Sequence, residues 1–221
     1  MIVTDEAQGL PRWTQSVGEE IANTLSHALG LLAALIGAPI LLVAASRNGS
    51  PGFFVGTVVF TITMSILYLG STLYHAWPQT PAKHFLQLFD HSAIYFLIAG
   101  TYTPFALGPL RGTVGFTLLV TIWTLAGVGV AIKVVRGTSR HPRLALALYL
   151  GMGWLALAIF KPFAMAVPLI TLVWLFAGGI AYTAGVLFFV NQRLRYAHFI
   201  WHLFVLAGTS CHFAAVLSCA S

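Results

Sequence analysis

Two histidines near the end of the chain have a spacing that favours metal binding. His198 and His202 lie four residues apart, so in a helix both imidazoles would share one face, roughly 6 Å apart along the axis. Neutral imidazole is a common ligand of zinc. Many histidine pairs at this spacing have no shared function, so the pair by itself is a weak signal for a metal site.

A third histidine and an acid strengthen this interpretation. His75 closes an earlier apolar segment, and three histidine ligands leave one tetrahedral position open, as in catalytic zinc sites. A water in that position becomes acidic enough to act as a nucleophile near neutral pH. Asp90, expected about one turn into its own apolar segment, could orient that water, act as its base, or hydrogen-bond a liganding imidazole. The sequence therefore predicts a metal centre of these three histidines with Asp90 beside it.

Each of these residues also has a structural interpretation. His75 would end its helix at the membrane interface, and Asp90 would stabilise a helix N-terminus through the helix dipole. Ser71 precedes His75 by four residues and shares its face, so its hydroxyl could bond the imidazole, a substrate or the carbonyl one turn back. We favour the metal centre, because these residues lie near the ends of apolar segments that share one side of the membrane.

Four more polar residues lie in or next to the apolar segments. Glu20, Asn23 and His27 form a stripe at i, i+3 and i+7. Glu20 and Asn23 could cap the first helix, and His27 could support the metal centre. His212 follows His202 by ten residues, about 15 Å further along a helix, which is too far to join the same metal. We expect His212 to be a hydrogen-bonded core or interhelical residue.

Seven apolar segments would have to position these side chains. Most are close to the roughly 20 residues that cross a bilayer as a helix, and short connections with turn-forming residues separate them. The expected spans are Thr24–Ala45, Gly52–His75, Leu86–Gly108, Gly112–Ile132, Leu144–Phe160, Ala164–Val190 and Ala197–Cys219. The fifth is short, and the sixth is long enough to tilt or to begin as an interfacial segment. The sequence predicts an all-α membrane protein, with a cytoplasmic segment of residues 1–23 and one seven-helix domain of residues 24–219.

The composition excludes an ordinary soluble domain. Hydrophobic residues make up 58% of the 221, and charged residues make up 7%, against about 25% in soluble domains. The mean hydropathy of +0.88 points the same way. The net charge of +6 does not indicate nucleic-acid binding, because the Lys and Arg residues lie between apolar segments, where they would face anionic lipid headgroups. We expect a multi-pass protein of the inner (plasma) membrane.

The distribution of basic residues predicts the orientation. With seven spans, the N-terminal segment and the loops after the second, fourth and sixth spans share one side of the membrane. Of the 11 Lys and Arg, eight fall on that side: Arg12, Lys83, Lys133, Arg136, Arg140, Arg143, Arg193 and Arg195. The other three are Arg47, Arg111 and Lys161. Because cytoplasmic loops carry the excess of Lys and Arg, we expect the N-terminus and the histidine cluster on the cytoplasmic side and the C-terminus outside.

Several motifs resemble those of a known family. They are EE-x-x-N-x-x-x-H at 19–27, STLYH at 71–75, FDHSAIYFLIAGTYTPF at 89–105, and HFIWH at 198–202 followed by HF at 212–213. Together and in this order they resemble the hemolysin III family, the bacterial branch of the progestin and adipoQ receptor (PAQR) family. The resemblance runs from about Glu19 to Phe213, nearly the whole chain.

The resemblance implies a seven-helix fold with a zinc ion near the cytoplasmic side. By motif, His75, His198 and His202 match the zinc ligands. Asp90 matches the acid that holds the zinc-bound water, and Ser71 matches the serine of the SxxxH element. The wider CREST superfamily is similar to alkaline ceramidases and is regarded as a group of membrane metal-dependent hydrolases. It implies hydrolysis of a lipid amide, with zinc-bound water attacking the carbonyl.

Other functions stay open at this point. A non-catalytic regulator or sensor of membrane lipids could keep the same residues around a structural zinc. Transport of metal or protons would need polar residues across the whole membrane, and beyond the cytoplasmic cluster the sequence offers mainly His212. A cytolytic protein is suggested by the family name alone. Membrane lipids, with a lipid amide as the substrate, are the expected partners, and the oligomeric state is left open.

Overall fold

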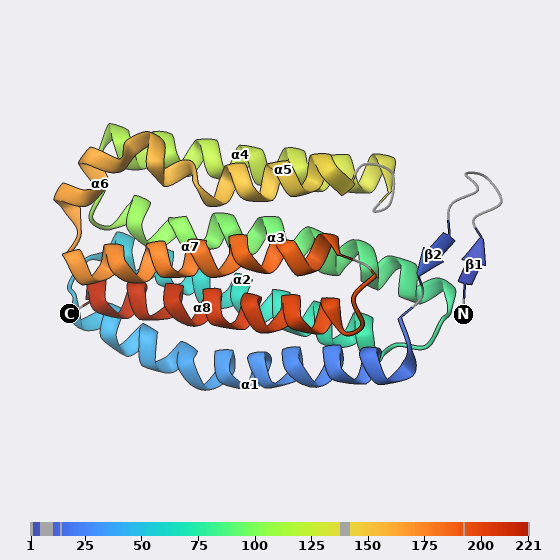
Figure 1. Cartoon of the computed structure of the whole chain (residues 1–221). Helices are drawn as coiled ribbons and strands as arrows, with labels where there is room; N and C mark the ends of the chain where they lie inside the picture. Colours follow the sequence, from blue (N-terminus) through green and yellow to red (C-terminus); the bar gives the residue numbers. More distant parts are fainter. Residues whose placement is uncertain (1, 5–10, 14, 138–141, 192, 221) are drawn as a thin grey trace.

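The structure, a computed structural model, is a bundle of helices (Figure 1). It describes residues 2–4, 11–13, 15–137, 142–191 and 193–220. The long helices are α1 (Val17–Arg47), α2 (Pro51–Ala76), α3 (Pro81–Leu107), α4 (Thr113–Arg136), α5 (Pro142–Gly153), α7 (Leu169–Val190) and α8 (Ala197–Ala220). Between α5 and α7 lie the 3-10 helix η1 (Leu155–Ile159) and the short helix α6 (Phe160–Ala166). Two three-residue strands, β1 (Ile2–Thr4) and β2 (Pro11–Trp13), pair antiparallel ahead of the bundle.

In the part of the chain that the structure describes, six helical segments are long and apolar enough to cross a membrane. They are α1, α2, α4, the segment Arg143–Ala166, α7 and α8. This finding confirms the prediction of an all-α membrane protein. The third expected span, α3, is not among the six, because polar residues such as Lys83, Asp90 and His91 lower its hydropathy.

The polar helix α3 lies inside the bundle. It packs against α2 and α4, and many of its side chains are buried, including Asp90 and Tyr95. In Figure 1 it runs through the middle of the molecule, between the pair α4 and α5 and the pair α2 and α8. A polar side chain in such a helix faces protein groups rather than lipid, which removes much of the cost of carrying it.

The first and last helices are neighbours. α1 packs against both α2 and α8, and α8 packs against α7. In Figure 1 the blue α1 lies directly beside the red α8, although almost the whole chain separates them. Residues of α1 can therefore contact side chains near the start of α8 and near the end of α2.

Helix α1 begins earlier than predicted and is capped by other residues. It starts at Val17 rather than Thr24, after the N-cap Ser16. The Ser16 hydroxyl accepts a hydrogen bond from the Glu19 amide at 3.3 Å, and the Ser16 amide donates to the Glu19 carboxylate at 2.8 Å. This reciprocal pair is a capping box. The suggestion that Glu20 and Asn23 cap the helix is therefore wrong, and both side chains can face the interior of the bundle instead.

Helix α3 also begins earlier than predicted. It starts at Pro81, five residues before the expected Leu86, so Asp90 lies nine residues inside the helix rather than one turn from its start. At that depth the helix dipole does not stabilise a carboxylate, because dipole effects are confined to the first and last turns of a helix. The structural interpretation of Asp90 as a helix-end residue is therefore wrong.

The fifth span is interrupted. α5 ends at Gly153, η1 and α6 follow, and α7 starts at Leu169 after the N-cap Pro168, so residues 164–166 belong to the fifth segment and not to the sixth. The Tyr102 hydroxyl of α3 lies 2.9 and 2.8 Å from the carbonyl oxygens of Met152 and Gly153 and accepts a hydrogen bond from the Ala156 amide at 3.2 Å. One side chain thus bonds backbone groups that the helix break leaves free. Among the basic residues used for the orientation, Arg140 lies outside the described residues.

Candidate metal centre and the cavity beside it

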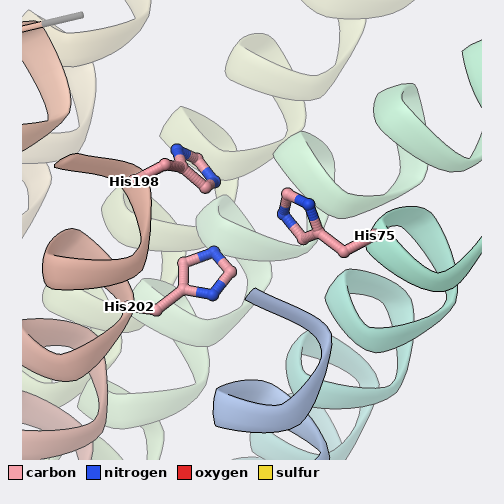
Figure 2. Close-up of side chains that lie close together, drawn as sticks. All are labelled: His75, His198 and His202. Atoms are coloured by element: carbon pink, nitrogen blue, oxygen red, sulfur yellow. The ribbon is translucent and has the colours of Figure 1, made fainter. Parts of the chain in front are cut away.

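His75 of α2 and His198 and His202 of α8 come together at one end of the bundle. One ring nitrogen of each lies within 4.8 Å of the other two, so the group could hold a metal ion. The ring centroids are 5.1, 5.0 and 4.6 Å apart. Figure 2 shows the three rings turned toward a shared space between α2 and α8. The structure brings together the three histidines that the sequence grouped.

Helix α1 orients two of these rings through their Nδ1 atoms. Nδ1 of His75 lies 2.7 Å from Oε2 of Glu20. Nδ1 of His202 lies 3.0 Å from the Ser26 hydroxyl and 3.3 Å from the carbonyl oxygen of Asn23. Histidines that bind metals usually bond a carboxylate or a carbonyl through the ring nitrogen that does not face the metal. Both rings show that pattern here.

Two ring nitrogens of the group have no partner. Nε2 of His75 and Nε2 of His198 are buried and make no hydrogen bond with any described residue. A buried polar atom left without a partner costs about 1–3 kcal/mol, so two in one group favour a bound ligand there. Three imidazoles with no thiolate among them suit zinc. The donor set of this site therefore fits zinc.

The carboxylate of Glu20 also joins helix α3 to the centre. Nζ of Lys83 lies 2.8 Å from Oε1 of Glu20 and donates to the carbonyl oxygen of Trp77 at 3.1 Å. The Lys83 side chain is 8% exposed, so this ion pair is shielded from water. Glu20 thereby contacts α2 and α3 from α1. Sequence reasoning missed this role, and the signal that could have found it was the helical stripe of Glu20 with His27.

Asp90 and Ser71 lie next to the histidines, in the wall of a cavity inside the bundle. Both are buried and line the same cavity, and the Asp90 carboxyl lies near the Ser71 hydroxyl and His75. Asp90 is not part of the group whose ligand atoms converge. The Ser71 oxygen makes no hydrogen bond to the carbonyl one turn back, in contrast to Thr72, which donates to the Tyr68 carbonyl at 2.7 Å. Ser71 is therefore available to a neighbour or a ligand.

A long, mostly apolar cavity begins at two of the three histidines, His198 and His202. It offers about 170 Å³ and is lined by side chains of every helix except α4. On α8 its wall runs from His198 to His212, which is 14 residues or about 21 Å along the axis. The far part is lined by side chains such as Phe105, Phe163 and Leu172. A space of this length and polarity can take a hydrocarbon chain with a polar group at the histidine end.

Three further histidines, His27, His91 and His212, lie in the wall of this cavity. His27 stacks face to face on His202, with ring centroids 3.6 Å apart and planes 12° from parallel, and it is not one of the three grouped histidines. His212 lies between α7 and α8, with its ring 5.4 Å from that of Tyr182 and directly against Gly178. Its interhelical position is the one expected from the sequence, and its Nδ1 has no hydrogen-bond partner among the described residues.

Comparison with known proteins identifies relatives over nearly the whole chain. The family model for Haemolysin-III related proteins matches residues 15–213. The Hemolysin-3 homolog of Bacillus subtilis is 42% identical over 202 residues, covering 91% of this chain and 94% of the relative. Hemolysin-3 of Bacillus cereus is 41% identical over 208 residues, covering 94% of each chain. The human Monocyte to macrophage differentiation factor is 27% identical over 218 residues, covering 93% of this chain and 86% of the relative.

No solved structure matches the chain. The matched family region contains all three grouped histidines together with Glu20, Ser71 and Asp90. The resemblance seen in the motifs is confirmed: the chain belongs to the hemolysin III family, within the progestin and adipoQ receptor family.

Proposed function

We propose that this protein is a zinc-dependent membrane hydrolase that cleaves a lipid amide. One observation carries the proposal: a largely buried group of three histidines has unpartnered nitrogens, and two of the three, His198 and His202, line one end of an apolar cavity inside the bundle. The polar end of a lipid would lie at the histidines, and its hydrocarbon chain would fill the rest of the cavity. One site then provides the two parts that a lipid hydrolase needs: a reactive centre and a space that binds the hydrocarbon chain.

In this proposal the metal is held by His75, His198 and His202. A zinc ion bound by three histidines supplies a Lewis acid and makes a water nucleophilic near neutral pH. Glu20 and Ser26 fix the ring orientation of His75 and His202 through Nδ1.

The neighbouring carboxylate supplies the proton transfers. Asp90 would accept a proton from the attacking water on a carboxylate oxygen and release it to the nitrogen of the leaving amine. The Ser71 hydroxyl lies near that carboxyl and would orient it. Both residues are buried, so bulk water would have little access to an acyl group bound beside them.

The proposal includes the membrane topology. We propose that α3 is a seventh span, because it packs within the bundle between α2 and α4. With seven spans, Lys83, Arg136 and Arg193 lie on the same side of the membrane as the N-terminus. Because cytoplasmic loops carry the excess of Lys and Arg, that side would be the cytoplasm. The histidine group then lies near the cytoplasmic face of the inner (plasma) membrane, and the C-terminus lies outside.

A second candidate is a lipid sensor in which zinc is structural. The observation in its favour is that the site joins three helices, since His75 lies on α2, His202 lies on α8, and α1 bonds both rings. A metal there would stabilise the bundle without any turnover. The sensor would keep its function when Asp90 is replaced, whereas the hydrolase would lose it.

The experiment begins with the metal. Zinc per monomer is measured by elemental analysis for detergent-purified wild type and for His198→Ala/His202→Ala, with the exposed His84→Ala as the matched control. We expect about one zinc in wild type and His84→Ala and none in the double variant. A panel of lipid amides is then tested for zinc-dependent cleavage. Wild type without zinc after supplementation would refute the metal centre, and bound zinc without cleavage of any lipid amide would favour the sensor.

A further inference from the structure

His27 is a buried polar side chain that the metal centre does not use. It lies on α1, is 3% exposed, and neither of its ring nitrogens has a hydrogen-bond partner among the described residues. An imidazole normally has at least one of its nitrogens bonded when it is buried, because a buried donor or acceptor without a partner is costly. Both atoms of His27 are left available to something that enters the cavity.

The packing of His27 fixes the plane in which those nitrogens lie. Its ring lies flat on His202, with centroids 3.6 Å apart and planes 12° from parallel. The edge of the Tyr68 ring meets it at 5.1 Å and 87°. The nitrogens of the two stacked rings lie in separate, nearly parallel planes, and His27 is outside the group of three whose nitrogens converge. It lines the cavity together with Ser71, Asp90 and His202.

From this arrangement we infer that His27 is a substrate-binding residue, whose ring N–H donates a hydrogen bond to the acyl carbonyl oxygen of the lipid amide. The inference rests on the proposed function for the identity of the ligand. A neutral imidazole has one hydrogen-bond donor and one acceptor, whereas Asp90 as a carboxylate only accepts hydrogen bonds. The carbonyl oxygen is an acceptor that gains negative charge during hydrolysis, so a donor beside the centre stabilises the reaction as well as binding.

The competing explanation is that His27 only packs against His202. A phenylalanine would keep a flat aromatic ring of similar size on His202 and against Tyr68, and it would remove both nitrogens. His27→Phe therefore separates the two explanations, because packing alone predicts no loss. His27→Gln provides a second test, since its amide N–H can replace the donor without aromatic stacking.

Binding can be measured without turnover. Trp154 and Trp201 line the cavity, so a brominated chain that enters it quenches tryptophan fluorescence. The probes are a brominated long-chain fatty amide and the brominated alkane of the same length, titrated into zinc-loaded wild type, His27→Phe and His27→Gln in detergent. Zinc per monomer and cleavage of the amide are measured on the same samples.

We expect wild type to bind the amide more tightly than the alkane. His27→Phe should weaken amide binding about tenfold, the size of one hydrogen bond, with alkane binding and zinc content unchanged, and His27→Gln should recover part of the loss. Equal amide affinity in wild type and His27→Phe, no preference for the amide in wild type, or loss of zinc in His27→Phe would each overturn the inference. The expected binding pattern without cleavage would leave His27 as a ligand-binding residue and refute the hydrolase. Cleavage of the amide by wild type, together with equal amide binding in wild type and His27→Phe, would support the hydrolase and overturn the inference about His27.

Discussion

The carboxylate of Glu20 lies 2.7 Å from Nδ1 of His75, on a different helix and 55 residues away in the chain. The same carboxylate bonds Lys83 through its other oxygen at 2.8 Å. With Nδ1 of His75 occupied in this way, Nε2 is directed into the histidine group, where it has no other partner. The first helix of the protein therefore controls the geometry of a site whose three histidines all belong to other helices.

Replacing Glu20 should weaken metal binding without removing a ligand. Glu20→Gln keeps the size of the side chain but removes the charge that orients His75, and loss of such a partner typically costs about 10- to 100-fold in metal affinity. The measurement is zinc affinity by competition with a chromophoric chelator. Glu19→Gln is the matched control, because glutamine also completes a capping box and Glu19 does not contact the histidines. Unchanged zinc affinity in Glu20→Gln would show that His75 needs no orienting acid.

Replacing Asp90 should separate metal binding from turnover. Asp90→Asn keeps the shape of the side chain but cannot accept the proton of the attacking water, so we expect full zinc content and a loss of cleavage of about 100-fold or more. Zinc per monomer and the rate of cleavage of a lipid amide that wild type hydrolyses are measured together. Full turnover in Asp90→Asn would remove its assigned role, whereas loss of zinc would make it a ligand.

The part of the site that was predictable depends on local spacing. His198 and His202 are one helical turn apart, so their shared face follows from the sequence, and His75 was grouped with them because it ends an apolar segment predicted to end on the same side of the membrane. The apolar segments themselves follow from composition. The partner of His75 was not predictable in the same way, because the Glu20 contact depends on how α1 packs against α2 and α8.

Two errors in the predicted helices have different causes. The break after Gly153 is stabilised by Tyr102 of another helix, so no local pattern near the break reveals its hydrogen bonds. The early start of α1 was missed because its first turn is polar and was assigned to the cytoplasmic segment, although Ser16 and Glu19 form a cap that the sequence does contain. Hydropathy locates the lipid-facing part of a helix, and caps locate its ends.

The close approach of α7 and α8 should depend on Gly178. A Cβ atom built at Gly178 would lie 2.4 Å from Cδ2 of His212, so Gly178→Ala must displace the imidazole or separate the helices. We expect a loss of stability of about 1–3 kcal/mol, the usual cost of overpacking a tight contact. Gly127→Ala in α4 is the control, since a Cβ atom there meets no atom within 4 Å. Thermal unfolding in detergent measures both, and equal melting temperatures would mean that His212 moves freely.

The break between α5 and η1 should depend on the hydroxyl of Tyr102. That oxygen lies within hydrogen-bond distance of two carbonyl oxygens and one amide at the break, and Tyr102→Phe leaves those backbone groups without this partner in a mostly apolar cavity wall. We expect Tyr102→Phe to lower the free energy of unfolding by about 1–3 kcal/mol, because the ring still fills its place and only the hydrogen bonds are lost. Tyr74→Phe is the matched control, since the Tyr74 oxygen accepts one half-buried hydrogen bond from Gln87 at 3.2 Å, and it should cost less. Thermal unfolding of both variants decides the matter: a loss in Tyr102→Phe no larger than in Tyr74→Phe would mean that other groups satisfy the broken helix.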